Sequence, residues 1–311
     1  MTDRASSARR TLVLGEALID IVRRHDGSTS EHVGGSPLNV ALGLAALDEA
    51  VDFATRYGDD ERGRRIAQTL ADGGVHPLPG SAEAVRTSTA VAMIDENAAA
   101  TYEFDLVWDL PSTPVSAQTV HLHTGSIAAV LEPGGSEVVA ALEVAREGST
   151  ISYDPNVRLQ IMTDLDAARV RIEQIIALSD VVKASDEDVA ALYPGHAVPD
   201  VLRAWGTLGA ALVIVTRGRE GVVASVTATG EVVSEPTRAT RVEDTVGAGD
   251  SFMAGLLSGL LERGLLGGPG SRARLAAASL ADIRPALERG LATSAITVGR
   301  AGAYAPSRTE L

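Results

Sequence analysis

Short apolar runs alternate with longer segments of helical spacing through the second half of the chain. We expect, in order, strand 120–124, helix 136–147, strand 151–154, helix 165–178, strand 181–184, helix 185–192 and strand 211–216. This alternation favours a parallel sheet whose strands are joined by crossover helices. The same pattern opens the chain, where the spacing predicts a strand over 11–19, a helix over 37–47 and a strand over 51–54.

Two stretches break this rhythm, residues 21–33 and about 87–107. Both alternate as strands do, for example at Thr89, Val91 and Met93, and neither contains a helix long enough for a crossover. We therefore expect antiparallel strands that form a small sheet apart from the main one. The pattern as a whole predicts a single α/β domain over residues 1–311 with this small sheet inserted.

Composition narrows the possible functions. The net charge is 27 − 41 = −14, which argues against nucleic acid or an anionic membrane as a partner. There are no cysteines, so disulfides and thiolate metal sites are excluded. No apolar segment is long enough to predict a membrane span, and the polar, basic start over 1–10 does not predict a secretory leader. We therefore expect a cytoplasmic protein.

The segment Asp-Thr-Val-Gly-Ala-Gly-Asp at 244–250 runs directly into a long apolar stretch. Its glycines allow a sharp turn whose successive N–H groups converge on one point, as an anion requires. If the apolar stretch is helical, its N-terminus adds further donors and a positive dipole end. A carboxylate beside a phosphate is unfavourable unless it takes a proton from the hydroxyl that attacks the phosphate, and Asp250 fits that role. The alternative is a glycine loop in which Asp250 caps the helix.

A second glycine turn, at residues 34–35, leads into another predicted helix. Pro37 suits the first turn of a helix, and Ser36 is a candidate for its N-cap. Asn39, one turn later, offers both a donor and an acceptor to a polyhydroxylated ligand. An ordinary helix after a glycine turn has the same features, so this segment is informative only together with the first.

Together the two segments resemble the motifs of the ribokinase-like (PfkB) carbohydrate kinases. That family pairs an N-terminal Gly-Gly-x-x-x-Asn with a C-terminal Asp-Thr-x-Gly-Ala-Gly-Asp-x-Phe, in the order and at the separation found here. The segments 15–20, 35–37 and 154–158 are most similar to the fructokinase branch, although residues 160–161 depart from it where a tryptophan is common. The resemblance implies a ribokinase-like α/β fold, with a mainly parallel central sheet flanked by helices and a small β-sheet lid over the sugar.

The resemblance also implies an activity, ATP-dependent phosphorylation of a primary hydroxyl of a small sugar, with fructose as the first candidate. Asp250 would be the general base, and the backbone N–H groups of Gly247, Ala248 and Gly249 would hold the moving phosphoryl group. Asp20 would end the first strand, where ligands of parallel sheets gather; a solvated strand-end carboxylate is the alternative. The residues expected to bind the sugar are Asp20, Gly34, Gly35, Asn39, Asn156 and Arg158.

ATP and Mg²⁺ are the cofactors that the resemblance implies. Ser185 and Asp188 stand at the family's Asn-x-x-Glu positions, which help to organise Mg²⁺ and phosphate. They are equally typical of a helix N-cap followed by an acidic first turn. Lys183 is the only lysine in the chain and is not followed by Ser or Thr, so a P-loop is excluded. The residues expected to contact ATP are Lys183, Ser185, Asp188, Thr216, Gly218 and Gly249.

Two other places are candidate metal sites. Asp244 and the carbonyl of Val246 stand where relatives hold a monovalent cation such as K⁺. His121 and His123 lie on one face of a predicted strand, as a metal pair would, but no third ligand is at hand. A pair of ordinary hydrogen-bonded histidines is the favoured interpretation of this segment.

Several alternatives stay open. A 2-keto-3-deoxygluconate kinase or a nucleoside kinase of the same family would share the motifs, although only 3% of residues are aromatic and Phe53, Tyr102 and Phe104 are the main candidates to stack a base. A catalytically silent sensor of sugar or nucleotide would keep the fold but would not need a base at 250. A dinucleotide-binding dehydrogenase is disfavoured, since no Gly-x-Gly-x-x-Gly follows the first strand. Exposed lid strands would also allow two copies of the chain to form a homodimer.

Overall fold

The computed structural model describes residues 9–96, 100–268 and 270–311. Most of the polar start from which the absence of a leader was predicted therefore lies outside the described residues. No helix within the described ranges combines the length and the apolar character needed to cross a bilayer.

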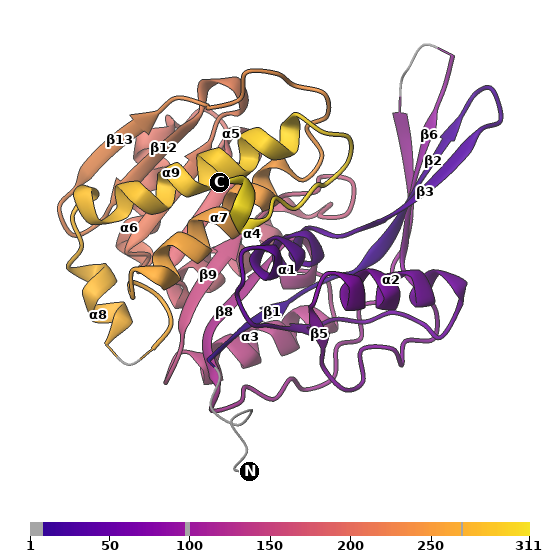
Figure 1. Ribbon diagram of the computed structural model, residues 1–311, viewed down its shortest axis with the longest axis horizontal. Helices are drawn as coiled ribbons and strands as arrows, with labels where there is room; N and C mark the ends of the chain where they lie inside the picture. Colours follow the sequence, from indigo (N-terminus) through magenta and orange to yellow (C-terminus); the bar gives the residue numbers. More distant parts are fainter. Residues whose placement is uncertain (1–8, 97–99, 269) are drawn as a thin grey trace.

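A nine-stranded sheet forms the centre of the molecule (Figure 1). Its strands are β1 (Arg10–Leu14), β4 (Val51–Ala54), β5 (His76–Pro77), β8 (Thr119–Gly125), β9 (Thr150–Asp154), β10 (Val181–Ser185), β11 (Leu212–Thr216), β12 (Val222–Val226) and β13 (Glu231–Glu235). They lie in the order β13-β12-β11-β10-β9-β8-β1-β4-β5. The pairs from β11 to β5 are parallel, and β12 and β13 form an antiparallel edge. The predicted α/β class with a mainly parallel sheet is confirmed.

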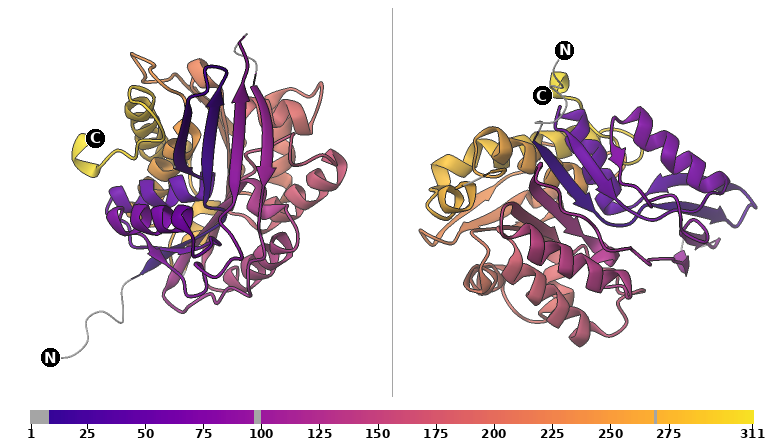
Figure 2. Two further views of the ribbon diagram at one scale, coloured as in Figure 1. Left: turned by 90° about the vertical axis from the view of Figure 1, so that its right-hand side faces the viewer. Right: turned by 90° about the horizontal axis from the view of Figure 1, so that it is seen from below.

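Helices cover both faces of this sheet (Figure 2, right). The first layer contains α1 (Ser36–Ala46), α2 (Glu61–Asp72), α7 (Ala248–Glu262), α8 (Ser271–Ala276) and α9 (Leu280–Val298), and the second contains α3 (Gly134–Ala145), α4 (Leu165–Leu178), α5 (Asp186–Leu192) and α6 (Val198–Leu208). Each layer encloses its own apolar core, and successive residues of a strand face opposite cores, as Val181 and Val182 do. Burial on both faces explains why the central strands are continuous apolar runs.

The predicted small sheet projects from this body as a lid (Figures 1 and 2). It consists of β2 (Leu18–Arg24), β3 (Thr29–Gly34), β6 (Thr89–Ile94) and β7 (Ala100–Asp105), in the order β3-β2-β6-β7. Strands β3 and β7 form its two edges, and a homodimer through them stays a prediction. The central pair, β2 and β6, is parallel rather than antiparallel. The chain passes from β2 through β3 into α1, β4, α2 and β5 before it returns to the lid as β6. The helices of this connection therefore lie in the body of the molecule and not in either lid segment.

The strand predicted over 11–19 is wrong as a single element. It is two strands, β1 in the large sheet and β2 in the lid, separated by residues 15–17. Gly15 stands at the break, where an added Cβ would lie 2.2 Å from Cγ of Pro37. The chain can change sheets here because glycine lets it pass directly against the first turn of α1.

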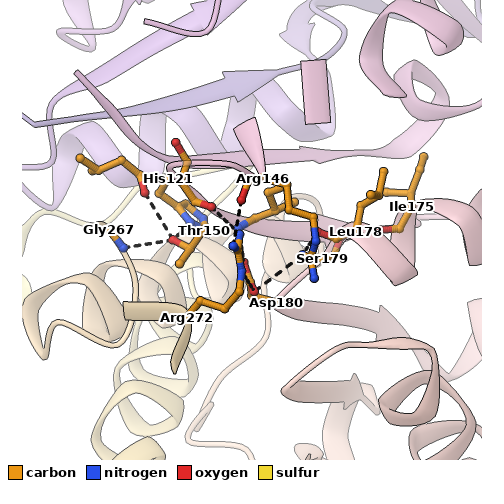
Figure 3. A network of polar contacts seen from close by, with 12 residues as sticks. His121, Arg146, Thr150, Ile175, Leu178, Ser179, Asp180, Gly267 and Arg272 are labelled. Carbon is orange, nitrogen blue, oxygen red and sulfur yellow. Dashed lines mark hydrogen bonds and ion pairs between the residues drawn. The ribbon is translucent and has the colours of Figure 1, made fainter. Parts of the chain in front are cut away.

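Polar contacts join the N-terminal ends of the parallel strands of the large sheet (Figure 3). Arg272 donates from Nε to Oδ1 of Asp180 at 2.7 Å, and Oδ2 of Asp180 accepts the backbone N–H of Ile151 at 2.7 Å. The ring nitrogens of His121 lie 2.9 Å from the hydroxyls of Thr150 and Ser152.

The two histidines are structural. His123 also contacts the Ser152 hydroxyl, at 2.9 Å, and burial lowers the pKa of each histidine to about 3. Among the described residues, no group of three or more His, Asp or Glu side chains is placed to hold a metal ion. The hydrogen bonds of both rings bear out the interpretation of His121 and His123 as an ordinary hydrogen-bonded pair.

Candidate active site

A cavity of about 1290 Å³ lies between the lid and the edge of the large sheet where its parallel strands end. Lid strands β2, β6 and β7 line one side, the ends of β10 and β11 line another, and the N-terminal turns of α1 and α7 complete it. Pockets that hold one drug-sized ligand usually measure about 300–1000 Å³, so this one has room for two ligands together.

The cavity brings together nearly all of the residues predicted for the site. Gly34 and Asp244 are the exceptions and do not line it. The predicted residues that do line it are Asp20, Gly35, Asn39, Asn156, Arg158, Lys183, Ser185, Asp188, Thr216, Val246, Gly218, Gly247, Ala248, Gly249 and Asp250.

Asp250 lies in the first turn of α7 and joins the two glycine motifs. Its Oδ1 accepts a hydrogen bond from Oγ of Ser36 at 2.6 Å, and its Oδ2 accepts one from Nδ2 of Asn39 at 2.8 Å. The N-cap of α7 is Gly247, so the alternative in which Asp250 caps the helix is wrong. Ser36 is not an N-cap either, because Gly35 occupies that position of α1. Both side chains that orient Asp250 therefore come from the first turn of α1.

The turn before Asp250 requires its glycines. Gly247 has a φ of 73°, and an added Cβ would lie 2.6 Å from Cβ of Ala303. At Gly249 an added Cβ would lie 3.0 Å from Nζ of Lys183. The backbone N–H groups at the start of α7 thus stand at the cavity wall, close to a lysine ammonium, where the helix dipole and the ammonium both favour an anion.

Asp20 faces the cavity from the lid. It lies inside β2 and not at the end of a strand of the large sheet. The strand-end argument for Asp20 is therefore wrong, although the residue lines the cavity as expected. Gly34 lets the two strands approach, since an added Cβ there would lie 2.0 Å from Oδ2 of Asp20. Partial removal from bulk water raises the pKa of Asp20, and the charge of Arg158 opposes this rise.

Two cavity residues that follow β8 and β9 have unusual backbone conformations. Ser126 and Asn156 have φ values of 56° and 40°, and Nδ2 of Asn156 donates to Oγ of Ser126 at 3.4 Å. Non-glycine residues in this region store strain and are often found at ligand sites. Beside them, Glu16 is only 6% exposed, and burial raises its pKa to about 7.

Ser185 and Asp188 form the start of α5. The Ser185 hydroxyl accepts the Asp188 N–H at 3.0 Å, and Oδ2 of Asp188 accepts the Ser185 N–H at 2.8 Å. The other carboxylate oxygen accepts the Val157 N–H at 2.7 Å. The helix N-cap and acidic first turn are therefore confirmed, and both oxygens of Asp188 are already used by backbone groups. A contact of either residue with nucleotide stays a prediction.

The remaining predicted residues lie near the end of β11 and the turn before α7. Thr216 ends β11 and donates from Oγ1 to the carbonyl of Ala184 at 3.3 Å. Asp244 lies behind the α7 turn, where its two oxygens accept the N–H groups of Val246 at 3.0 Å and Gly302 at 2.8 Å. These bonds lower the pKa of Asp244. Cation binding there stays a prediction.

Glu16, Ser36 and Ser126 are polar residues of the cavity that sequence reasoning did not name as parts of the site. Ser36 could be found only from the contact between α1 and α7, because it meets Asp250 across 214 positions of sequence. Glu16 had a signal that was not used, a single carboxylate in an otherwise apolar segment between two strands.

Comparison with known proteins gives one consistent result. The profile of the pfkB family carbohydrate kinases matches residues 8–310. A fructokinase from Klebsiella pneumoniae is 36% identical over 262 residues, which cover 81% of this chain and 85% of that protein. A Vibrio cholerae fructokinase double mutant, solved in a fructose, ADP and potassium ion bound form, superposes with a TM-score of 0.76 at 26% identity and 98% coverage of both chains. An aminoimidazole riboside kinase from Salmonella enterica, complexed with its riboside and an ATP analogue, gives a TM-score of 0.74 at 25% identity and 95% coverage of both chains.

Proposed function

The chain belongs to the pfkB family of carbohydrate kinases, and we propose that it phosphorylates a primary hydroxyl of a small neutral sugar, with fructose as the best candidate. Members of this family are ATP-dependent phosphotransferases, so the class of reaction is established. The proposal concerns the sugar, the residues and the order of events in the cavity.

One observation carries the proposal: Asp250 stands beside the N–H groups of the α7 turn and is oriented by two donors from α1. Hydrogen bonds from Ser36 and Asn39 fix its carboxylate at the meeting point of the lid side and the strand-end side of the cavity. A base must lie within reach of the proton that it removes, and a fixed carboxylate meets this requirement without reorganisation. An acceptor hydroxyl placed here would be next to the phosphoryl group that it attacks.

The reaction then follows from these positions. Asp250 takes the proton of the sugar hydroxyl as its oxygen forms a bond to the γ-phosphorus of ATP. The bond from that phosphorus to the bridging oxygen breaks, and ADP leaves with the electron pair. Negative charge that develops on the moving group would be stabilised by the backbone N–H groups of Gly247, Ala248 and Gly249.

The lid would hold the sugar. Asp20 on β2 offers two acceptor oxygens to hydroxyls, and Gly34 and Gly35 keep the adjoining turn close to it. Asn156 and Arg158 would contact the other end of the sugar. A lid closed over the ligand also excludes water, which would otherwise accept the phosphoryl group.

The charges in the cavity favour a neutral substrate. Asp20 and Asp250 face the space left for the sugar, with Arg158 near the first and Lys183 near the second. A 2-keto-3-deoxygluconate molecule carries a carboxylate, which these acidic groups would repel at short distance. A nucleoside is the second alternative, because Tyr102 and Phe104 stack on the lid with ring centroids 6.1 Å apart and line the same cavity.

We propose that ATP binds at the strand-end side, against Lys183, Ser185, Asp188, Thr216 and Gly218, and that Mg²⁺ enters on its phosphates. The described residues offer Mg²⁺ no cluster of three side-chain ligands, which suits an ion held largely by phosphates and water. A potassium ion near Asp244 and the Val246 carbonyl would add positive charge behind the α7 turn. The potassium ion in the related Vibrio cholerae structure supports this proposal.

Measurement of ADP release with Mg²⁺, ATP and a panel of acceptors tests the proposal. The panel contains fructose, 2-keto-3-deoxygluconate and aminoimidazole riboside, and we expect the highest kcat/KM with fructose. Asp250→Asn keeps the size of the side chain but removes the base, so kcat should fall by about 10²–10⁴-fold. Asp200→Asn, which neutralises an exposed carboxylate on α6, is the control and should keep the wild-type kcat.

Each outcome has a distinct meaning. A higher kcat/KM for the acid or the riboside would replace fructose with that substrate. Equal turnover by the wild type and Asp250→Asn would refute the base assignment. Nucleotide binding without turnover on any acceptor would favour a silent sensor.

A further inference from the structure

The chain contains one lysine, and that lysine is buried at the active site. Of the 27 basic residues, 26 are arginines and only Lys183 is a lysine. Its side chain is 5% exposed and forms an ion pair with Asp154, which is 1% exposed, at 2.7 Å between Nζ and Oδ2. Burial alone would lower the pKa of Lys183, but the carboxylates of Asp154 and Asp250 outweigh that effect and raise it, so the ammonium is charged.

The two strands that carry this pair place it beneath the start of α7. The register of β9 and β10 pairs Tyr153 with Val182, so Asp154 and Lys183 are the next neighbours along these parallel strands. Tyr153 and Val182 both face the core on the α3 side, and strand alternation therefore turns Asp154 and Lys183 toward α7. An added Cβ on Gly249 would lie 3.0 Å from the ammonium, which sets Lys183 directly against the turn of N–H groups.

Asp154 has no other role visible in its contacts. Among the described residues, no hydrogen-bond donor other than the Lys183 ammonium reaches either of its oxygens. A carboxylate that is buried and left with one partner is costly, and stability alone does not favour it over an apolar pair. Its geometry instead restricts one side chain, the lysine, to one position.

We propose that Lys183 supplies a fixed positive charge to the phosphoryl group during its transfer, and that Asp154 positions the lysine side chain. This inference rests on the proposed function and adds a side-chain cation to the backbone N–H groups of the α7 turn. The ammonium contributes no bond that forms or breaks, and Asp154 acts only through it.

The choice of lysine in a chain that otherwise uses arginine is part of the argument. An ammonium is a compact point charge, whereas a guanidinium is a broad plane with five donors. Nζ lies 2.7 Å from Oδ2 of Asp154, and a Cβ on Gly249 would lie 3.0 Å from it, so we expect the broader guanidinium to be misplaced here. Lys183→Arg should therefore keep the charge and still lose activity.

A single lysine permits a direct readout that does not depend on turnover. Protein labelled with ¹³C at lysine Cε should show one side-chain signal in a two-dimensional spectrum. We expect addition of the ATP analogue AMP-PNP to shift this signal more than ADP does, because only the analogue has a γ-phosphoryl group. If the enzyme is active and neither nucleotide shifts this signal, the inference is overturned.

Kinetics of four variants supply the second readout. Lys183→Met should lower kcat by about 10²–10³-fold, as loss of one preorganised donor to a reacting oxygen does, and leave the KM for the sugar within about threefold. Asp154→Asn should lower kcat by a smaller factor, since the lysine stays but is no longer fixed. The double variant Asp154→Asn/Lys183→Met should be no slower than Lys183→Met, and Lys183→Arg should resemble Lys183→Met.

Stability must be separated from catalysis, because breaking a buried ion pair destabilises a protein whereas removing both charges is often tolerated. The double variant should therefore unfold near the wild-type temperature and still be slow. Asp180→Asn is the matched control, since Asp180 is equally buried and pairs with Arg272 at the opposite edge of the sheet (Figure 3). We expect it to lower the unfolding temperature and keep kcat.

The outcomes distinguish this inference from the proposed function. Full activity of Lys183→Met or of the double variant would overturn the inference and leave the kinase assignment intact. A wild-type enzyme with no activity on any sugar and no response of the lysine signal to nucleotide would overturn both.

Discussion

Glu16 makes the stability of this protein depend on pH in a way that can be calculated. Its side chain is 6% exposed in the turn between β1 and β2, and one oxygen accepts the Ala128 N–H at 3.3 Å. Burial raises its pKa from 4.5 to about 7, because removal of the charged form from water outweighs the hydrogen bonds that it accepts. The difference of about 2.5 pKa units corresponds to about 3 kcal/mol of folding free energy at 1.36 kcal/mol per unit.

The sign follows from proton binding in the two states. Below pH 4.5 the Glu16 carboxyl is protonated in both the folded and the unfolded chain, and its contribution to stability is complete. Between pH 4.5 and about 7 the unfolded chain has released this proton and the folded chain still holds it. The free energy of unfolding therefore falls as the pH rises through this window, by about 3 kcal/mol from this group.

Glu16→Gln tests the calculation, since glutamine has nearly the same shape and is neutral at every pH. Urea unfolding followed by the fluorescence of the buried Trp108 and Trp205 should be measured for both proteins from pH 4.5 to 8. The free energy of unfolding of the wild type relative to Glu16→Gln should fall by about 3 kcal/mol over this range. Other titrating groups are present in both proteins and cancel in the difference.

Glu143→Gln is the control, because it makes the same chemical change at an exposed position on α3. Its stability should follow the wild-type curve at every pH. If the curves for the wild type and Glu16→Gln are parallel, Glu16 does not hold its proton in the folded state and the argument from its burial is wrong.

Two further variants probe the cavity directly. Gly34→Ala places a Cβ within 2.0 Å of Oδ2 of Asp20 and should displace that carboxylate. In steady-state assays we expect the KM for the sugar to rise at least tenfold and kcat to change less than threefold. An unchanged KM would show that Asp20 does not bind the sugar. Ser36→Ala deletes the 2.6 Å hydrogen bond to Asp250, and because the base is then less well oriented, kcat should fall about 10- to 100-fold. The unfolding temperature should fall as well, since bonds to a charged group contribute about 1.5–3 kcal/mol to stability. Wild-type turnover would show that Asn39 alone orients the base.

The parts of the fold that could be predicted are those whose periodicity is set by burial on both sides. Strands β8 to β11 are covered by helices on each face, so their sequences are short apolar runs that stand out between α3, α4 and α5. The hairpin of β12 and β13 was missed because β13, Glu231–Glu235, lies at the sheet edge and alternates only partly. Helix α9 was missed as an element because Pro285 and Gly290 interrupt its pattern, although its N-terminus at Ser279 has a capping box with Asp282.

The residues of the site also fall into those that local sequence reveals and those that only the packing of distant segments brings together. The turn at 247–250 and the pair at 34–35 are local, so glycine and aspartate at fixed spacing reveal them. The ion pair of Asp154 with Lys183 and the hydrogen bonds of Asp250 join residues from distant segments, and their distances depend on how α1, α7 and the sheet pack. Local sequence can name such residues as candidates but cannot say which of them touch.

Ser36 illustrates why a local rule fails at a functional position. A serine before proline at the start of a helix is usually the N-cap, where its hydroxyl accepts a backbone N–H and contributes about 1 kcal/mol. Here Gly35 takes that position with a φ of 119°, a conformation that other residues rarely adopt, and an added Cβ would lie 2.4 Å from the carbonyl oxygen of Glu16. Helix α1 therefore begins at Ser36 itself, and no side chain caps it. The Ser36 hydroxyl can then donate to Asp250. Gly35 thus exchanges a small amount of helix stability for the orientation of the base, whereas Gly34, which has no positive φ, is required by the close approach of Asp20.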